Sequence, residues 1–358
     1  MENRKKVTPL KKALIIFLIT LCAILALVLA ILIGAHALTP VIFNEFYSNA
    51  DAEYVTPGIY EGLVPQGYAY IEEEDGDVIY LQCGYMADGV SASRIYVTRQ
   101  LSDSSYDTGY VELYAADGTP YTGHTGGITS FGEFIWLAND GDGDDNCVWV
   151  LSLDEVIAKS LLNEEKVTLE TSFKPESRSA YCFADGKYLW VGEFYDAEKY
   201  PTKDTHKFEV SGGTNSALIC AYKLDETSKY GISYEQDGEN AVVTPELLLS
   251  VTDRVQGFTR TPDGFALSSS YSVTPSHLRF YSDATKNSPD AALSVNGEDV
   301  PVYFLDADVL TKDVQAAPMS EEIFVKDGRL YVLFESACQK YIFGNFTHGI
   351  HIYSYALD

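Results

Sequence analysis

Short apolar runs that alternate with polar positions recur along this chain, and tight turns join them in pairs. In one pair, Ala180-Tyr-Cys-Phe183 is followed by a turn and then by Tyr188-Leu-Trp-Val191. Asp-Gly between such runs is a strong signal of a β-hairpin. The pattern occurs five times, with turns at Asp75-Gly76, Gly132-Glu133, Asp185-Gly186, Asp263-Gly264 and Asp327-Gly328. A repeated hairpin predicts a β-propeller or another array.

Further apolar runs extend four of the five units to four predicted strands, and the last unit to three. Residues 167–172 are the predicted fourth strand of the second unit, and residues 300–305 that of the fourth. One unit cannot bury both faces alone, so the units are expected to stack. We predict an all-β fold, a five-bladed β-propeller preceded by one N-terminal transmembrane helix.

The missing strand of the last unit is predicted to come from the N-terminal side of the domain. A strand within residues 54–63 would pair beside residues 350–355 and close the ring, which removes an open sheet edge. A six-bladed ring is the alternative. Its extra blade would have to lie between the turns at Asp185 and Asp263, a gap that we interpret as a long insertion in unit 3 at residues 196–216.

An uncharged apolar segment of residues 13–35 precedes the repeats and is long enough to cross a bilayer. The basic residues before it place the N-terminus in the cytoplasm. We predict a cytoplasmic stub (1–12), a transmembrane anchor (13–37), a stalk (38–52) and an extracellular β-propeller domain (53–358). Ala35-His-Ala37 resembles a signal-peptidase site, but the apolar run exceeds that of signal peptides, which favours an uncleaved signal-anchor in the cell membrane.

The charge of the chain is divided unevenly. Its net charge is −27, yet five of its 25 basic residues lie before residue 13, so the predicted domain is strongly acidic. Such a surface argues against nucleic acid as a partner and against adhesion to anionic lipid. It suits a soluble domain, or one that attracts cations.

Five of the six cysteines lie outside the predicted anchor, and none has C-x-x-C spacing. We predict that they are small buried residues on strands. A disulfide between Cys83 and Cys338 is the alternative, since closure of the ring would make their strands neighbours.

Propeller topology predicts where a site would lie. The start of each first strand and the end of each second strand meet at one mouth of the central channel, opposite the hairpins. Polar residues concentrate at these positions, and convergent polar groups at such a mouth are the default site hypothesis. A polar channel without a ligand is the alternative. The predicted ligand-binding residues are His124, Arg178, Glu193, Gln256, Glu322 and Glu335.

One loop of unit 2 is rich in carboxylates. Asp140, Asp142 and Asp144 have the spacing that opens an EF-hand, but Asp145 and Leu151 then break the motif. These three aspartates are the predicted metal ligands, for a divalent cation such as calcium. A solvated loop, in which Asp, Asn and Gly satisfy turn geometry, is the alternative.

Standard enzyme motifs are missing from the sequence, including the G-x-S-x-G elbow, the P-loop and the dinucleotide fingerprint. Paired carboxylates for glycoside hydrolysis remain an option, because Asp140, Glu193, Glu322 and Glu335 could approach one another across the channel. The sequence therefore leaves open whether the protein is an enzyme.

Four runs carry a resemblance to known proteins: Gly123-His-Thr-Gly-Gly-Ile128, Leu189-Trp-Val-Gly-Glu-Phe194, Arg254-Val-Gln-Gly257 and Leu333-Phe-Glu-Ser-Ala337. Here the chain resembles bacterial secreted or membrane-anchored β-propeller proteins of unassigned function. It is more loosely similar to the NHL and gluconolactonase-like propellers, and the latter hold a divalent metal at the channel mouth with Glu, Asn and Asp. Gln256 stands where that pattern has Asn-Gly, so no catalytic residue is transferred.

These observations lead to a functional prediction. The chain is expected to be a cell-surface binding or scaffold module that recognises a glycan, a peptide or a partner protein through the mouth residues. The alternative is a metal-assisted hydrolase, of the lactonase or glycosidase type, that uses the same residues.

Overall fold

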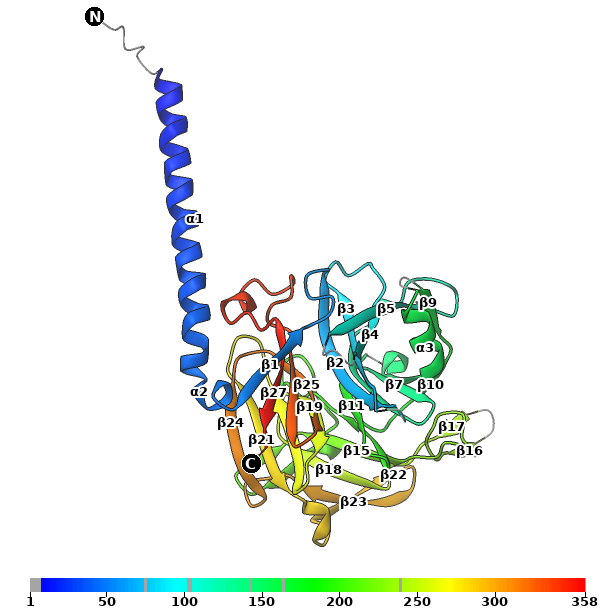
Figure 1. Ribbon diagram of the computed structural model, residues 1–358. Helices are drawn as coiled ribbons and strands as arrows, with labels where there is room; N and C mark the ends of the chain where they lie inside the picture. Colours follow the sequence, from blue (N-terminus) through cyan, green and yellow to red (C-terminus); the bar gives the residue numbers. More distant parts are fainter. Residues whose placement is uncertain are drawn as a thin grey trace, which may run out of the picture.

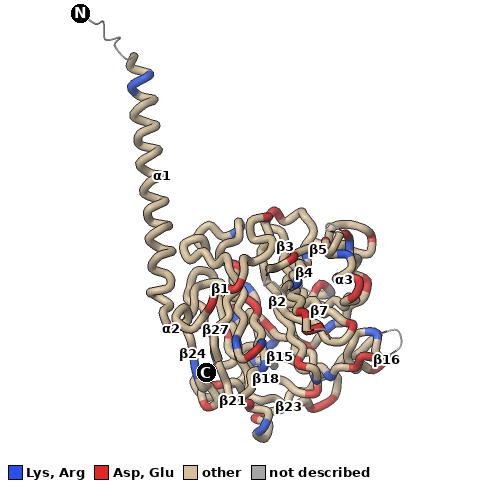
Figure 2. The backbone as a smooth tube through the Cα atoms, in the orientation of Figure 1, with Lys and Arg blue, Asp and Glu red and all other residues tan. Residues whose placement is uncertain are grey.

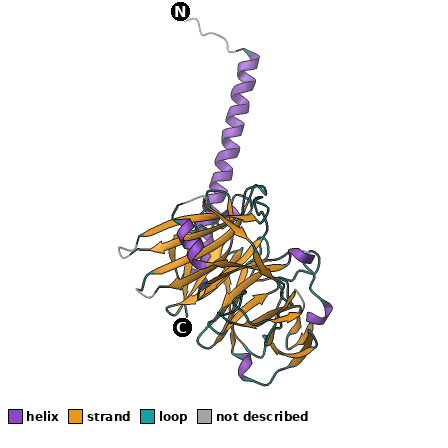
Figure 3. Cartoon of the chain, turned by 90° about the vertical axis from the view of Figure 1, so that its right-hand side faces the viewer, coloured by secondary structure: helices purple, strands orange, loops and turns teal. Residues whose placement is uncertain are grey.

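A computed structural model describes residues 8–73, 76–101, 105–141, 143–162, 165–237 and 240–357. It is a five-bladed β-propeller with one long N-terminal helix, as the sequence predicts. Figure 1 shows the blades arranged around a centre, with helix α1 projecting from the body. Figure 3 shows the same helix from the side.

Each blade is built on four antiparallel strands. In blade 5, one of the four comes from the N-terminal side of the domain. Blade 1 contains β2 (Leu63–Glu72), β3 (Val78–Met86), β4 (Arg94–Gln100) and β5 (Tyr106–Ala115). Blade 2 contains β6 (Thr125–Phe131), β7 (Phe134–Asn139), β8 (Cys147–Ser152) and β10 (Thr171–Phe173). Blade 3 contains β11 (Tyr181–Ala184), β12 (Tyr188–Gly192), β15 (Ala217–Lys223) and β18 (Leu247–Val251). Blade 4 contains β19 (Val255–Arg260), β20 (Gly264–Ser269), β21 (Ser276–Ser282) and β24 (Leu310–Ala316). Blade 5 contains β25 (Ser320–Lys326), β26 (Arg329–Phe334), β27 (His351–Ala356) and β1 (Ala50–Val55).

Short elements occupy the connections between these strands. They are α3 (Leu153–Ser160), β9 (Glu165–Leu169), β13 (Phe208–Val210), β14 (Gly213–Asn215), β16 (Glu235–Asp237), β17 (Asn240–Val242), β22 (Ala291–Val295), β23 (Glu298–Phe304) and the 3-10 turns η1 (Gly143–Asp145), η2 (Asp204–His206), η3 (Ala284–Lys286) and η4 (Gly344–Phe346). β13 and β14 form a hairpin inside the predicted insertion of unit 3, so the gap there holds no sixth blade.

The hydrophobic core lies between neighbouring blades. One cluster joins blades 2 and 3 through Trp136, Leu189 and Tyr222, and another joins blades 3 and 4 through Trp190 and Phe258. Each blade therefore buries both faces against its neighbours, which is why a single unit could not fold alone. All six cysteines are free thiols, and the five in the propeller are buried, as predicted; Cys83 and Cys338 form no disulfide.

The ring closes through its N-terminal strand. β1 pairs antiparallel with β27, from Ala50 opposite Tyr355 to Val55 opposite His351. Closure is thus confirmed, but the strand lies earlier than predicted, because Leu63 already begins the first strand of blade 1. The segment expected to be a stalk contains the end of α1 (Pro9–Ile42), the short helix α2 (Asn44–Tyr47) and the start of β1.

Two predicted fourth strands belong elsewhere. Residues 165–169 form β9, which pairs parallel with β5 at the outer edge of blade 1, and only residues 171–173 complete blade 2. Residues 300–305 fall mostly in β23, which pairs parallel with β18 in blade 3, while β24 completes blade 4. Connections from blades 2 and 4 therefore extend the preceding blade, a pairing that covers its exposed edge.

Glycines let the inner strands approach one another closely at the axis. A Cβ on Gly67 would lie 2.5 Å from the backbone nitrogen of Ile128, and one on Gly127 would lie 2.6 Å from that of Cys182. Gly257 is equally close to the backbone of blade 5. The inner strands of blades 1, 2, 4 and 5 also carry a β-bulge near these positions. The glycine that precedes an apolar residue at the start of these hairpins therefore serves packing at the axis.

Candidate functional site

A cavity of about 760 Å³ lies at the mouth that the topology predicts. It is lined by residues from all five blades and their loops. Aromatic rings, amides and charged groups mix on its wall, among them Gln66, Tyr85, His124, Phe194, Lys199, Tyr200, Gln256, Tyr271, Glu335, Lys340 and Tyr341. Its size and its mixture of rings with a few polar groups are typical of small-ligand sites.

Glu335 lines this cavity, and its carboxyl group pairs with that of Glu321. Glu321 and Glu335 are 1% and 8% exposed, and they are hydrogen-bonded to each other. Gln66 Nε2 donates to Glu335 Oε2 at 2.9 Å, and Gln256 Nε2 donates to Glu321 Oε1 at 3.3 Å. Two buried carboxyl groups that are hydrogen-bonded to each other share one proton, because both cannot be ionised in a buried site.

The pKa values of the pair follow from this arrangement. Burial raises the pKa of Glu335 to about 7, although bonds from Gln66 and Glu321 act in the opposite direction. Burial and the neighbouring Glu335 carboxylate raise the pKa of Glu321 well above its usual range. A carboxyl group that titrates near neutral pH can donate or accept a proton in catalysis.

The upper wall of the cavity carries positive charge in a protein that is otherwise acidic. Lys340 Nζ donates to Tyr85 Oη at 2.7 Å and lies over that ring, while Lys199 lies over Tyr271 at 5.7 Å from the centroid. Both lysines are exposed, and no ion pair joins either to a carboxylate among the described residues. Arg254 stacks on the same Tyr271 ring at 4.4 Å.

The structure places the six predicted ligand-binding residues in three different surroundings. His124, Gln256 and Glu335 line the mouth cavity. Arg178 lies beside it, where its Nε donates to Asp140 Oδ1 at 2.7 Å. Glu193 and Glu322 are only 1% exposed and turn into the body of the propeller.

Glu322 occupies the centre of the ring. Its Oε2 accepts the backbone N–H of Tyr68 at 3.1 Å and that of Ile128 at 2.9 Å, so one carboxyl group joins the inner strands of blades 1, 2 and 5. Burial raises the pKa of Glu322 well above its usual range, against the effect of these backbone bonds. Glu322 lines a second cavity, of about 690 Å³, on the hairpin side of the propeller.

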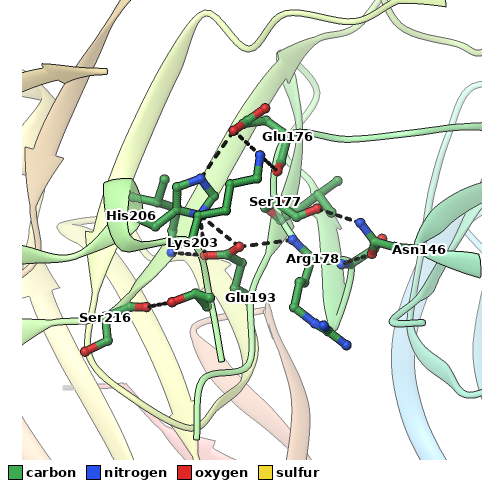
Figure 4. A network of polar contacts seen from close by, with 12 residues as sticks. Asn146, Glu176, Ser177, Arg178, Glu193, Lys203, His206 and Ser216 are labelled. Carbon is green, nitrogen blue, oxygen red and sulfur yellow. Dashed lines mark hydrogen bonds and ion pairs between the residues drawn. The ribbon is translucent and has the colours of Figure 1, made fainter. Parts of the chain in front are cut away.

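Glu193 instead holds the insertion of unit 3. Figure 4 shows its carboxylate facing His206, whose Nδ1 lies 3.0 Å from both oxygens. His206 Nε2 reaches Glu176 at 3.3 Å, and the backbone N–H groups of Arg178 and Leu218 donate to Glu193. Burial would lower the pKa of His206, but its bonds to Glu176 and Glu193 prevail and raise it to about 9. His206 is therefore an imidazolium, fully buried, that fixes the insertion to the blade.

The predicted metal ligands lie on the loop after β7. Asp140 is held by Arg178 Nε, Asp142 lies outside the described residues, and the Asp144 side chain does too. Within the described residues, no three His, Cys, Asp or Glu side chains come together as a group that could hold a metal ion. The calcium site stays a prediction.

The six predicted ligand-binding residues leave out much of the cavity wall. Lys199 and Tyr200 come from the insertion of unit 3, and Lys340 and Tyr341 from the long connection between β26 and β27. These loops follow no strand pattern. Their lengths are the only signal that could have indicated them, since long loops on a rigid scaffold often carry function.

No protein-family model matches the chain, and no curated protein matches it in sequence. Solved structures resemble its fold. They include a glutaminyl cyclase from Myxococcus xanthus, with 10% identity, a TM-score of 0.37 and coverage of 80% of this chain and 91% of that one. An exo-β-1,3-galactanase from Phanerochaete chrysosporium has 10% identity and a TM-score of 0.44, over 86% of this chain and 63% of that one.

A GH43_1 enzyme from Xanthomonas citri has 12% identity and a TM-score of 0.42, over 86% of this chain and 89% of that one. At these identities the likeness concerns the fold alone.

Proposed function

We propose that this protein is a membrane-anchored, extracellular binding module whose mouth cavity takes an acidic glycan. The observation that carries the proposal is the composition of the cavity wall. Aromatic rings and amides line the cavity together with the carboxyl group of Glu335 and two lysines that have no carboxylate partner among the described residues. Each of these features matches one part of an acidic sugar.

The rings offer flat apolar surface with hydroxyl groups at the edge, on which a sugar ring can stack. Gln66, Gln256 and Glu335 offer both donors and acceptors for sugar hydroxyls. Lys199 and Lys340 offer positive charge to a carboxylate or sulfate group. In a chain with a net charge of −27, these two lysines attract anions to the mouth, although Asp140 and Glu335 also line the cavity.

The test is a binding titration with matched oligosaccharides that differ only in charge, such as a uronate oligomer and its neutral counterpart. We expect saturable binding of the acidic oligomer that weakens as salt increases. Lys340→Gln should weaken binding about tenfold, the order of one lost charge contact. Lys223→Gln, which removes the same charge outside the cavity, is the matched control. Equal binding of neutral and acidic oligomers, or equal effects of the two variants, would refute the proposal.

A second candidate function rests on the Glu321–Glu335 pair. A carboxyl group with a pKa near 7 is suited to general acid–base catalysis, so the same cavity could hydrolyse a glycoside or lactone. Turnover that Glu335→Gln abolishes, with the thermal midpoint and ligand binding retained, would favour the hydrolase. Binding without turnover of any acidic oligosaccharide would favour the binding module.

A further inference from the structure

The connection between β26 and β27 contacts the end of α1. We refer to residues 339–348 as the η4 loop. Its Asn345 carbonyl accepts a hydrogen bond from His36 Nε2 at 2.6 Å, and His348 stacks on the His36 ring with the centroids 4.8 Å apart. Figure 1 shows this loop beside α1. The contact fixes the orientation of the propeller relative to the helix.

The η4 loop exposes large apolar side chains. Ile342 is 79% exposed, Phe343 70% and Phe346 37%, and the nearby helix residues Leu38 and Val41 are exposed as well. Scattered apolar residues on a surface need no explanation, but these form one group beside a helix that is long and apolar enough to cross a membrane.

The η4 loop carries no negatively charged side chain, although the body of the protein is strongly acidic. The chain contains 52 acidic residues, yet residues 339–348 include none, and Lys340 is their one basic residue. Figure 2 shows acidic residues over the blades and none in the chain around η4. The η4 loop is therefore a segment whose own charge an anionic membrane surface would not repel.

The length of α1 sets the depth at which the η4 loop lies. About 20 residues cross the hydrocarbon layer, so a span that starts at residue 13 leaves it near residue 32. His36 then lies about 6 Å farther out, at 1.5 Å per residue, which is within the headgroup layer. The loop that contacts His36 is held at the same level.

We infer that the η4 loop inserts its apolar side chains into the outer leaflet of the bilayer that α1 crosses. The inference rests on the proposed anchoring. Aromatic residues favour this interfacial layer. Since Lys340 and Tyr341 also line the mouth cavity, docking of the loop places one wall of that cavity at the membrane surface.

The test uses the full chain in phosphatidylcholine vesicles that contain brominated lipids, which quench nearby tryptophan. Phe343→Trp places the probe on the η4 loop. Leu162→Trp places one on an exposed residue, 69% accessible, at the end of α3 away from α1. The wild-type chain supplies the background from its three tryptophans.

We expect brominated lipid to quench the added emission of Phe343→Trp and not that of Leu162→Trp, and Ile342→Trp should behave like Phe343→Trp. Vesicle flotation of the wild-type chain separates the two possible failures. A chain that floats, but whose tryptophan at 343 is quenched no more than that at 162, overturns the docking and leaves the anchor intact. A chain that does not float overturns both.

Discussion

Several ionisable side chains are buried inside this propeller, and His206 is the clearest case. Its ring has no exposed surface and contacts carboxylates on both nitrogens. His206→Ala would leave Glu193 buried without its partner, a change that typically costs about 3–5 kcal/mol of stability. We expect a lower thermal midpoint. Asp204→Asn, whose parent side chain is 96% exposed, is the matched control and should leave the midpoint nearly unchanged.

The same histidine predicts a dependence of stability on pH. Its pKa is raised from 6.5 to about 9 in the folded chain, so the protonated form is the one that folding favours. Its contribution is complete below pH 6.5 and is lost as pH rises through 9. The difference in unfolding free energy between wild type and His206→Ala should therefore shrink across this range. A difference that grew with pH would contradict the assignment of an imidazolium.

The carboxyl pair predicts a second pH effect, at lower pH. The pKa of Glu335 is raised from 4.5 to about 7, so folding favours the protonated carboxyl group. The stability that this protonation contributes is complete below pH 4.5 and is lost as pH rises through 7. Glu335→Gln keeps a neutral hydrogen-bonding group and should flatten this part of the stability profile. Chemical denaturation at several pH values measures it. An unchanged profile would mean that the two carboxyl groups do not share a proton.

Glu322 gives a prediction that separates a structural role from a binding role. Glu322→Ala would leave the backbone N–H groups of Tyr68 and Ile128 buried without partners, at about 1–3 kcal/mol for each group. We expect a marked loss of thermal stability, whereas a residue that only contacted ligand would leave the midpoint of the free protein unchanged.

At the scale of elements, closure of the ring by β1 is the feature most open to test. A chain that begins at residue 43 keeps Phe46, whose ring packs within 6 Å of Phe334 and Tyr355, and it keeps β1. A chain that begins at residue 56 exposes the edge of β27. We expect the first to unfold cooperatively and the second to melt lower and aggregate. Equal melting of the two chains would show that β1 does not close the ring.

The sequence predicted the elements whose signals are local. In hairpins such as Ala180–Val191, alternating apolar and polar residues and an Asp-Gly turn indicate both strands. The structure contains both strands of each predicted pair. The parallel partners β9 and β23 were assigned to the wrong blades, because their pairing with β5 and β18 depends on which blades are neighbours in space. No periodicity along the chain encodes that information.

The sequence also predicted only part of the candidate site, because some of its residues lie where the strand pattern is irregular. Topology correctly brought His124, Gln256 and Glu335 to one mouth. Glu321 and Glu322 lie in the bulge between Ser320 and Ile323, where the alternation that assigns side chains to faces breaks down. Only the structure reveals that Glu322 turns to the axis while Glu321 pairs with Glu335.

At the scale of the whole molecule, the protein is a closed ring, and we propose that its mouth cavity binds an acidic glycan close to the membrane. One cavity wall and the proposed lipid contact share the η4 loop, so ligand binding and membrane docking involve the same segment. We expect the hairpins at the opposite rim to take no part in either.

Hydrogen–deuterium exchange of the full chain, with and without a saturating acidic oligosaccharide, tests this account most directly. We predict slower exchange in the segments that carry Lys199, Tyr271 and Lys340, and unchanged exchange in the opposite hairpins near Gly186 and Gly328. Protection confined to the hairpin side, or absent at a concentration that saturates binding, would contradict the assignment of the mouth cavity as the functional site.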